Sequence, residues 1–189
     1  EIRQSLKRAA GNSERIKSIA ADLRTFSRRD EGSYDEDVDI NAVVRSSVSL
    51  VGNLITKRTG NLKLELGNDI PQVKGNFQRL EQVVINLLQN AAQALESPDK
   101  AITVVTLHDK CTGTVTLRVK DEGRGISKKD LEHIFDPFFT TKRSCEGTGL
   151  GLSICKKIVE RHRGNIDISS SANHGTEIRV TIYAMQQGP

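Results

Sequence analysis

Tryptophan is absent from this 189-residue chain, and aromatic residues make up only 4% of it. We therefore expect a hydrophobic core that is mostly aliphatic. Cysteine is also scarce, because only Cys111, Cys145 and Cys155 occur and they form no CxxC pair. This pattern favours reduced structural thiols over disulfides or a metal site. No apolar run approaches the roughly 18–20 residues of a membrane-spanning helix, and no signal-peptide pattern opens the chain, so we expect it to be cytoplasmic.

Basic charge is concentrated at the start of the chain. Residues 1–29 contain eight Lys or Arg and three Asp or Glu, within a net charge of +4 for the whole. Nucleic-acid binding is disfavoured, because these charges alternate with apolar or small residues at helical spacing. The stripe with four-three spacing consists of Ile2, Leu6, Ala9, Ser13, Ile16, Ala20, Leu23 and Ser27. It predicts a long amphipathic helix that packs against a second copy of the chain or, alternatively, on its own domain.

Residues 30–39, with the sequence DEGSYDEDVD, contain six acidic residues in ten positions. Like-charge repulsion and the pair Gly32-Ser33 disfavour a helix here. We therefore predict an acidic linker between the helical arm at 1–29 and a globular domain at 40–185.

Hydrophobic periodicity divides the globular part into helices of period 3.6 and strands of period two. The predicted helices are 41–58, 76–96, 128–135 and 150–163. The predicted strands are 61–67, 102–109, 114–123, 165–171 and 176–184, with a short extended piece at 72–75. This order indicates an α+β fold, a two-layer α/β sandwich with helices on one face of the sheet, preceded by the long N-terminal helix.

Two glycine clusters predict a nucleotide site. DEGRGI at 121–126 and GTGLGL at 147–152 flank an aromatic and basic stretch, FDPFFTTKR. The second cluster opens a predicted helix, whose N-terminal N–H groups and dipole attract anions. The helix at 76–96 adds a stripe of polar side chains beside its apolar face, Arg79, Gln82, Asn86, Asn90 and Gln93. Such a stripe suggests a polar cleft, with a solvent face or a buried amide network as the alternatives.

These motifs resemble the nucleotide-binding domain of the GHKL superfamily, which groups the DNA gyrase B subunit, a heat-shock chaperone, histidine kinases and MutL. The resemblance covers about 38–184, and its motifs follow the family order. Residues 76–96 resemble the N box, DEGRGI the first glycine box, FDPFFTTK the F box and GTGLGL the second glycine box. GTEIRVTI at 175–182 resembles the closing segment. A lone GxG arises by chance, but the ordered set is specific.

The resemblance implies ATP and Mg²⁺ as cofactors. On the adenine side, Asp121 would accept a hydrogen bond from the exocyclic amine, a donor that guanine lacks at that position. Gly123 and Gly125 would let the chain pass close to the base, and Ile126 and Leu152 would form an apolar wall. Thr176 would contact adenine directly or through water.

On the phosphate side, the resemblance implies that Asn90 supplies an amide oxygen to Mg²⁺. Lys142 and Arg143 would add positive charge over the γ-phosphate as a lid closes. The remaining positions of the ATP-binding boxes, including glycines whose N–H groups would meet the phosphates, are Thr140, Thr141, Gly147, Thr148, Gly149, Leu150 and Gly151.

Asn86 precedes Asn90 by four residues and so shares its helix face. In ATP-hydrolysing branches of the superfamily this position is typically a Glu that activates water, whereas Asn is neutral and takes up no proton. The resemblance therefore implies γ-phosphoryl transfer to another acceptor, as in histidine kinases, with Asn86, Asn90 and Lys142 as catalytic residues. The F box and the short lid are similar to the nitrogen-regulation type of sensor kinase.

Residues 16–28 resemble the second helix of the kinase dimerisation and phosphoacceptor hairpin. This implies a homodimer through residues 1–29, a histidine acceptor outside this chain, and a response regulator as partner in two-component signalling. The histidines of the chain lie outside the arm, and we expect each to be a surface or turn residue; they are His108, His133, His162 and His174. The parent protein would be cytoplasmic, or anchored in the inner membrane with this domain in the cytoplasm. A stand-alone GHKL ATPase and a partner-binding module without catalysis are the alternatives.

Overall fold

The computed structural model describes residues 33–141 and 148–185. The helix predicted over residues 1–29 lies outside these ranges. Apart from the first strand, the described elements follow the predicted order. They are β1 Glu36–Val38, α2 Ile40–Thr56, β2 Asn61–Leu66, β3 Val73–Gly75, α3 Phe77–Ala94, β4 Ala101–Asp109, β5 Thr114–Asp121, α4 Lys128–Leu131, α5 Gly151–Arg161, β6 Asn165–Ser170 and β7 Thr176–Tyr183. None of the described helices is both long and apolar enough to cross a bilayer.

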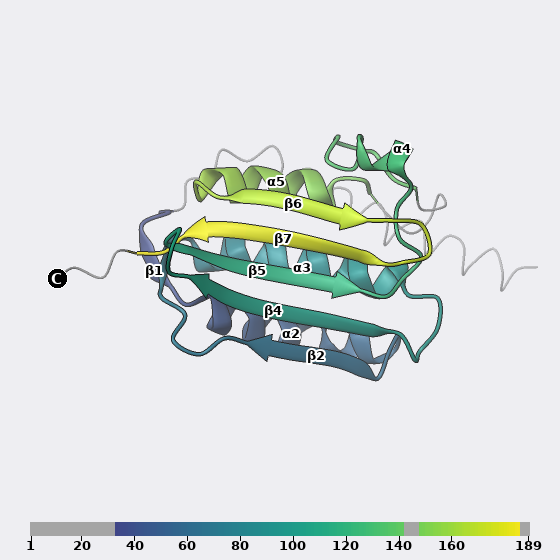
Figure 1. Cartoon of the computed structure of the whole chain (residues 1–189), viewed down its shortest axis with the longest axis horizontal. Helices are drawn as coiled ribbons and strands as arrows, with labels where there is room; N and C mark the ends of the chain where they lie inside the picture. Colours follow the sequence, from purple (N-terminus) through teal and green to yellow (C-terminus); the bar gives the residue numbers. More distant parts are fainter. Residues whose placement is uncertain (1–32, 142–147, 186–189) are drawn as a thin grey trace, which may run out of the picture.

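Five strands form one mixed sheet in the order β2-β4-β5-β7-β6. β2 runs parallel to β4, and the other neighbouring pairs are antiparallel. Helices α2, α3 and α5 lie behind this sheet in Figure 1, and α3 contacts both of the other two. The predicted two-layer α/β sandwich is therefore confirmed, with α3 at the centre of the helical layer.

The core between helices and sheet is aliphatic, as the shortage of aromatic residues predicts. Within the described ranges, every buried hydrophobic residue is Val, Ile, Leu, Ala or Cys. On β4, Ile102 and Val104 are completely buried, because alternate residues of a strand point to the same face. On α3, burial recurs at three- and four-residue steps, at Leu80, Val83, Val84, Leu87, Leu88, Ala91 and Ala92. One amphipathic helix thus packs its apolar stripe against the sheet.

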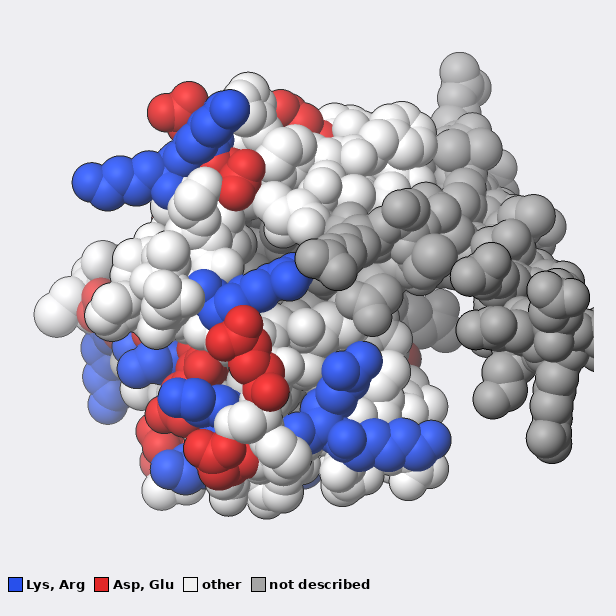
Figure 2. Space-filling model, turned by 90° about the vertical axis from the view of Figure 1, so that its right-hand side faces the viewer, with Lys and Arg blue, Asp and Glu red and all other residues white. Residues whose placement is uncertain are grey.

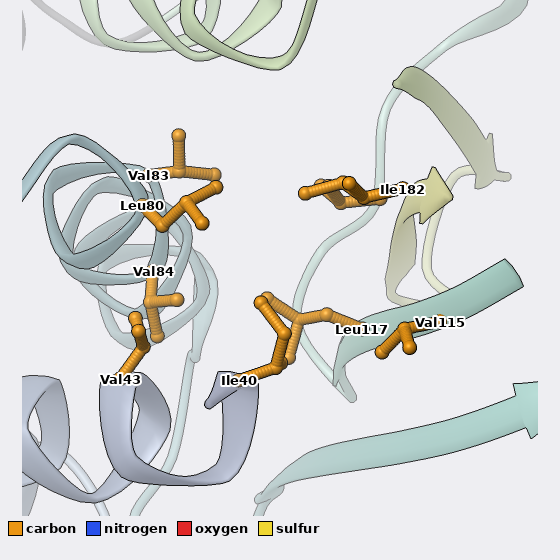
Figure 3. Close-up of a pocket in the computed structure, with 9 residues that line it drawn as sticks. Ile40, Val43, Leu80, Val83, Val84, Val115, Leu117 and Ile182 are labelled. Carbon is orange, nitrogen blue, oxygen red and sulfur yellow. The ribbon is translucent and has the colours of Figure 1, made fainter. Parts of the chain in front are cut away.

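A small cavity lies inside this core, between the start of α2, the first half of α3 and strands β5 and β7 (Figure 3). Its volume is about 10 Å³, the lower limit for one water molecule, and its lining side chains are all aliphatic. It is therefore a gap in packing and not a ligand site, and the nucleotide motifs lie elsewhere.

The predicted acidic linker at 30–39 is wrong in its second half. Glu36–Val38 form strand β1, which pairs antiparallel with β3. Val38 is buried, and Lys74 Nζ lies 2.5 Å from Asp37 Oδ1, so burial and an opposite charge offset the repulsion that the sequence suggested. Asp39 then caps α2 by accepting hydrogen bonds from two backbone N–H groups. The ordered domain thus begins before residue 40.

Candidate nucleotide site

Asp121 is a buried carboxylate at the C-terminal end of β5. Asp121 is only 5% exposed. In the antiparallel pairing of β5 with β7, it lies opposite Thr176. Asp121 Oδ1 accepts a hydrogen bond from the backbone N–H of Gly123 at 2.8 Å. In the described part of the chain, no Lys or Arg forms an ion pair with it. Burying a carboxylate without a counter-ion costs free energy, which makes Asp121 a candidate for the ligand contact predicted from the sequence.

Burial raises the pKa of Asp121 from 3.8 to about 6. Hydrogen bonds from the backbone at Gly123 and Thr176 act in the opposite direction and favour the ionised form. Desolvation is the larger effect, because the carboxylate loses water and gains only neutral donors. The site therefore holds an acceptor whose charge costs free energy until a ligand donor reaches it.

The first glycine cluster is required by packing within the chain. A Cβ on Gly123 would lie 2.5 Å from the carbonyl oxygen of Ala94 at the end of α3. Gly125 has φ +68°, and a Cβ there would overlap the carbonyl of Ser171 in the turn between β6 and β7. These contacts differ from the predicted reason, close approach to a base. The glycines let the loop after Asp121 pass between α3 and that turn.

Hydroxyl groups line the same end of the sheet. Ser170 Oγ accepts from the backbone N–H of Ile126 at 2.9 Å, and it donates to the carbonyl of Gly175 at 2.8 Å. Ser170 Oγ also lies 3.0 Å from Thr176 Oγ1, which is buried. Ser170 was not predicted, because nothing in the run of three serines at 169–171 distinguishes it. Its position at the end of β6, beside Thr176, became visible only in the folded sheet.

The amide stripe of α3 meets the start of α5. Asn86 Nδ2 donates to the carbonyl oxygen of Gly151 at 3.3 Å. A Cβ on Gly151 would lie 3.9 Å from Asn90 Nδ2 and 4.0 Å from Asn86 Cγ. Both asparagines are half-buried. The structure thus brings Asn86, Asn90 and the second glycine cluster together, as the sequence predicts.

The N-terminus of α5 has no side-chain cap. By contrast, Asp39 caps α2 and Asn76 caps α3. The turn before α5 is held by Gly149, which has φ +71° and whose carbonyl accepts from the backbone N–H of Phe138 at 2.9 Å. Within the described part of the chain, the N-cap residue Leu150 thus gives the first N–H groups of α5 no side-chain acceptor, and such a helix start suits an anion.

Figure 2 views the end of the molecule at which β5 terminates. Lys and Arg are interspersed with Asp and Glu toward the lower left, and uncharged residues form much of the remaining coloured surface.

Comparison with known proteins identifies the family. The family described as "Histidine kinase-, DNA gyrase B-, and HSP90-like ATPase" matches residues 75–186. The chain belongs to this ATPase family. The match includes both glycine clusters and the amide helix, so the motifs that carried the resemblance lie within it.

Curated relatives of this family member include proteins named as sensors. A putative sensor protein of Shewanella frigidimarina is 34% identical over 187 residues, which are 99% of this chain and 28% of the relative. The C4-dicarboxylate transport sensor protein DctB of Rhizobium meliloti is 36% identical over 180 residues, 95% of this chain and 28% of the relative. The chain therefore spans less than a third of the length of either relative.

Solved structures place the chain among histidine kinase catalytic domains of this ATPase family. The catalytic domain of histidine kinase ThkA matches with a TM-score of 0.68 and 33% identity, over 78% of this chain and 95% of that one. Histidine kinase ThkA in complex with the response regulator TrrA matches with a TM-score of 0.79 and 25% identity, over 100% of this chain and 53% of that one. The sensor-kinase resemblance is thus confirmed, and the nitrogen-regulation type stays a prediction.

Only some of the other residues predicted to contact ATP lie in the described part of the chain. Lys142, Arg143 and Gly147 lie outside the described residues, and exposed Thr140 and Thr141 come just before them. The remaining positions belong to the second glycine box and the first turn of the following helix.

Leu150 is completely buried in the core, so its predicted role in the ATP site is limited to its backbone. Its N–H donates to Thr148 Oγ1 at 3.3 Å, which orders the turn into α5. Leu152 is half-buried in the first turn of α5, and Ile126 is half-buried after the first glycine cluster.

Proposed function

We propose that this chain binds ATP with adenine at Asp121 and the phosphates at the start of α5. The adenine amine would donate to the Asp121 carboxylate, with Thr176 beside it. Backbone N–H groups at Gly149 and Gly151 would contact the phosphates, with Lys142 and Arg143 adding positive charge.

The residues present fit both cofactors. A buried carboxylate with only neutral donors matches an amine, and a helix start without a side-chain cap matches a polyphosphate. The described residues contain no group of three or more His, Cys, Asp or Glu arranged for a metal. Mg²⁺ would therefore be held by the Asn90 amide oxygen together with phosphate oxygens and water. Bound there, Mg²⁺ supplies charge neutralisation for phosphoryl transfer.

We further propose that this chain is the catalytic region of a sensor histidine kinase. It would transfer the γ-phosphoryl of ATP to a histidine that lies outside the chain. The observation that carries this proposal is Asn86, whose amide donates to Gly151 O at the phosphate end of the site. A neutral amide held in this position cannot deprotonate water, so bound ATP is kept for a protein acceptor. Asn86 would orient the start of α5, and Asn90 would place Mg²⁺ beside it.

The partners of the proposed kinase follow from its relatives. Residues 1–29 would pair with the same segment of a second chain, and the acceptor histidine would lie on a helical domain of the parent chain or of the dimer mate, outside this sequence. A response regulator would then receive the phosphoryl group, which agrees with the similarity to ThkA in its complex with TrrA. The domain would act in the cytoplasm, whether or not the parent protein is membrane-anchored.

The experiment supplies the chain with Mg²⁺, γ-labelled ATP and a separate acceptor hairpin that contains a histidine. The expected product is acid-labile phosphohistidine on the hairpin, at a rate exceeding that of phosphate release. Asn90→Ala should abolish transfer, because the metal loses its protein ligand. If ATP binds by calorimetry and yet no phosphohistidine forms, the kinase proposal is wrong. Steady hydrolysis that depends on Asn90 would instead support a stand-alone ATPase.

A further inference from the structure

His162 is a buried imidazole that the proposed chemistry does not use. It lies in the turn that follows α5, as the helix's C-cap residue, so the expectation of a turn residue is met, but at 5% exposed it is buried and not at the surface. In Figure 1, β1 and the C-terminal end of α5 lie on the left, whereas β5 ends on the right. The α3 helix between Asn76 and Asn90 alone spans about 21 Å at 1.5 Å per residue. His162 is thus far from the nucleotide site.

Two hydrogen bonds determine which form of the imidazole is present. His162 Nε2 accepts from the backbone N–H of Asn76 at 3.0 Å, and His162 Nδ1 lies 2.8 Å from the carbonyl oxygen of Ile158. A backbone N–H only donates and a carbonyl only accepts, so the ring is neutral and carries its proton on Nδ1. We call these two bonds the His162 bridge. It joins the end of α5 to the residue that precedes α3.

The ring is also held sterically. A Cβ on Gly75 would overlap the ring at Cδ2 and lie 2.7 Å from Nε2, so the ring occupies space that only glycine leaves open. Tyr34 also packs against the imidazole in an edge-to-face arrangement, with ring centroids 4.9 Å apart and an interplanar angle of 65°. His162 is therefore clamped between β3 and the segment that enters the domain.

Asn76 connects the His162 bridge to that incoming segment. Its Oδ1 caps α3 by accepting from the N–H of Arg79, and its Nδ2 donates to the carbonyl of Ser33 at 3.0 Å. Lys74 adds a hydrogen bond to the carbonyl of Asp35 at 3.0 Å, beside the pairing of β1 with β3. One short stretch, 73–76, thus holds residues 33–38 and starts the helix that carries the site amides.

We propose that His162 is a positioning residue: its neutral imidazole fixes stretch 73–76 against α5 and thereby holds residues 33–38 in place. The point at which the chain enters the catalytic domain is then set by this imidazole. The inference rests on the proposed function in one respect, because residues 1–29 are proposed to be the second helix of the dimerisation and phosphoacceptor hairpin. The His162 bridge holds residues 33–38 in place without contacting ATP.

A matched pair of amide substitutions tests this. The Gln side chain places an oxygen near the position of Nε2 and keeps the bond from Asn76, whereas Asn places its nitrogen near Nδ1 and keeps only the bond to Ile158. Hydrogen exchange of the β1 amides is expected to be about tenfold faster in His162→Asn and close to wild type in His162→Gln. ATP affinity should be unchanged in both. Equal exchange in the two variants, whether fast or slow, would overturn the proposal, and so would a loss of ATP affinity.

Two further measurements keep the proposal testable if the Asn variant fails to fold. Nitrogen-15 spectra of histidine in the wild-type chain should show His162 as the neutral Nδ1–H tautomer, and a charged ring or the other tautomer would overturn the proposal. Gly75→Ala should release β1 by displacing the ring, whereas Gly52→Ala, with no atom within 4 Å, should not. Unchanged β1 exchange in Gly75→Ala would count against it. Because ATP binding is measured in the same samples, failure of the nucleotide site is seen separately.

Discussion

Replacing Asp121 with Asn should stabilise the free protein and weaken its ATP binding. Burial raises the pKa of this carboxyl from 3.8 to about 6, a difference of roughly two units, and each unit corresponds to about 1.36 kcal/mol. Ionising Asp121 in the folded chain therefore costs about 3 kcal/mol. Above pH 6 the wild type bears this whole cost, and the Asn variant, which cannot ionise, does not.

The pH dependence follows from proton binding. Between pH 3.8 and about 6 the folded state binds the proton more tightly than the unfolded state, so stability falls as pH rises through this window. At about pH 8 the variant should be more stable than the wild type by up to about 3 kcal/mol. At about pH 5 that advantage should shrink by about 1.4 kcal/mol, because most of the wild-type carboxyl is then protonated. The difference of about 3 kcal/mol at about pH 8 is an upper bound, since the side-chain amide of the Asp121→Asn variant must also accept the hydrogen bond from the N–H of Gly123.

Urea unfolding at the two pH values measures the stability, and calorimetry measures ATP binding. Loss of a hydrogen bond to a charged group should reduce ATP affinity by roughly 10- to 100-fold. Asp69→Asn is the control, because Asp69 is exposed and its φ of 53° is tolerated by Asn, so neither quantity should change. An Asp121→Asn variant that is less stable than wild type at both pH values, or that binds ATP normally, would refute the reasoning.

Three other outcomes are expected. Gly149→Ala should weaken ATP binding by tenfold or more in calorimetry, because φ +71° and overlap with the preceding loop add roughly 1–3 kcal/mol of strain, whereas Gly52→Ala should bind normally. Leu88→Ala removes a completely buried side chain and should lower the free energy of unfolding by about 2–5 kcal/mol. Leu50→Ala, at a position 63% exposed, should change it by less than about 0.5 kcal/mol in the same denaturant titration. Burial raises the pKa of the Cys155 thiol to about 12, so alkylation followed by mass spectrometry should modify it only in unfolded protein, and rapid native labelling would contradict this.

The regular elements were predictable because one-sided burial leaves a periodic record in the sequence. α3 begins one residue after its predicted start and ends two residues before its predicted end, and β5 ends two residues early, at Asp121. β1 was missed for the opposite reason. Its acidic composition argued for a solvated linker, and only pairing with β3 and the ion pair to Lys74 makes it a strand.

The candidate site was predictable where chemistry resides in a motif. Asp121 was singled out by its place at a strand end beside glycine and the two asparagines of α3 by the resemblance to the N box, and the fold brings the asparagines to the start of α5. Ser170 and His162 could not be recognised, because an isolated serine or histidine is common at the surface. Their roles depend on partners 44 and 86 residues away along the chain.

The amino-acid sequence alone determined the family, the order of helices and strands, and the residues offered to a nucleotide. Those properties reside in local periodicity and in short motifs. Only the tertiary structure decided that the glycines after Asp121 serve internal packing, that Leu150 belongs to the core, and that His162 is neutral and buried. The physical reason is that burial and hydrogen-bond pairing between distant segments exist only once the chain has folded.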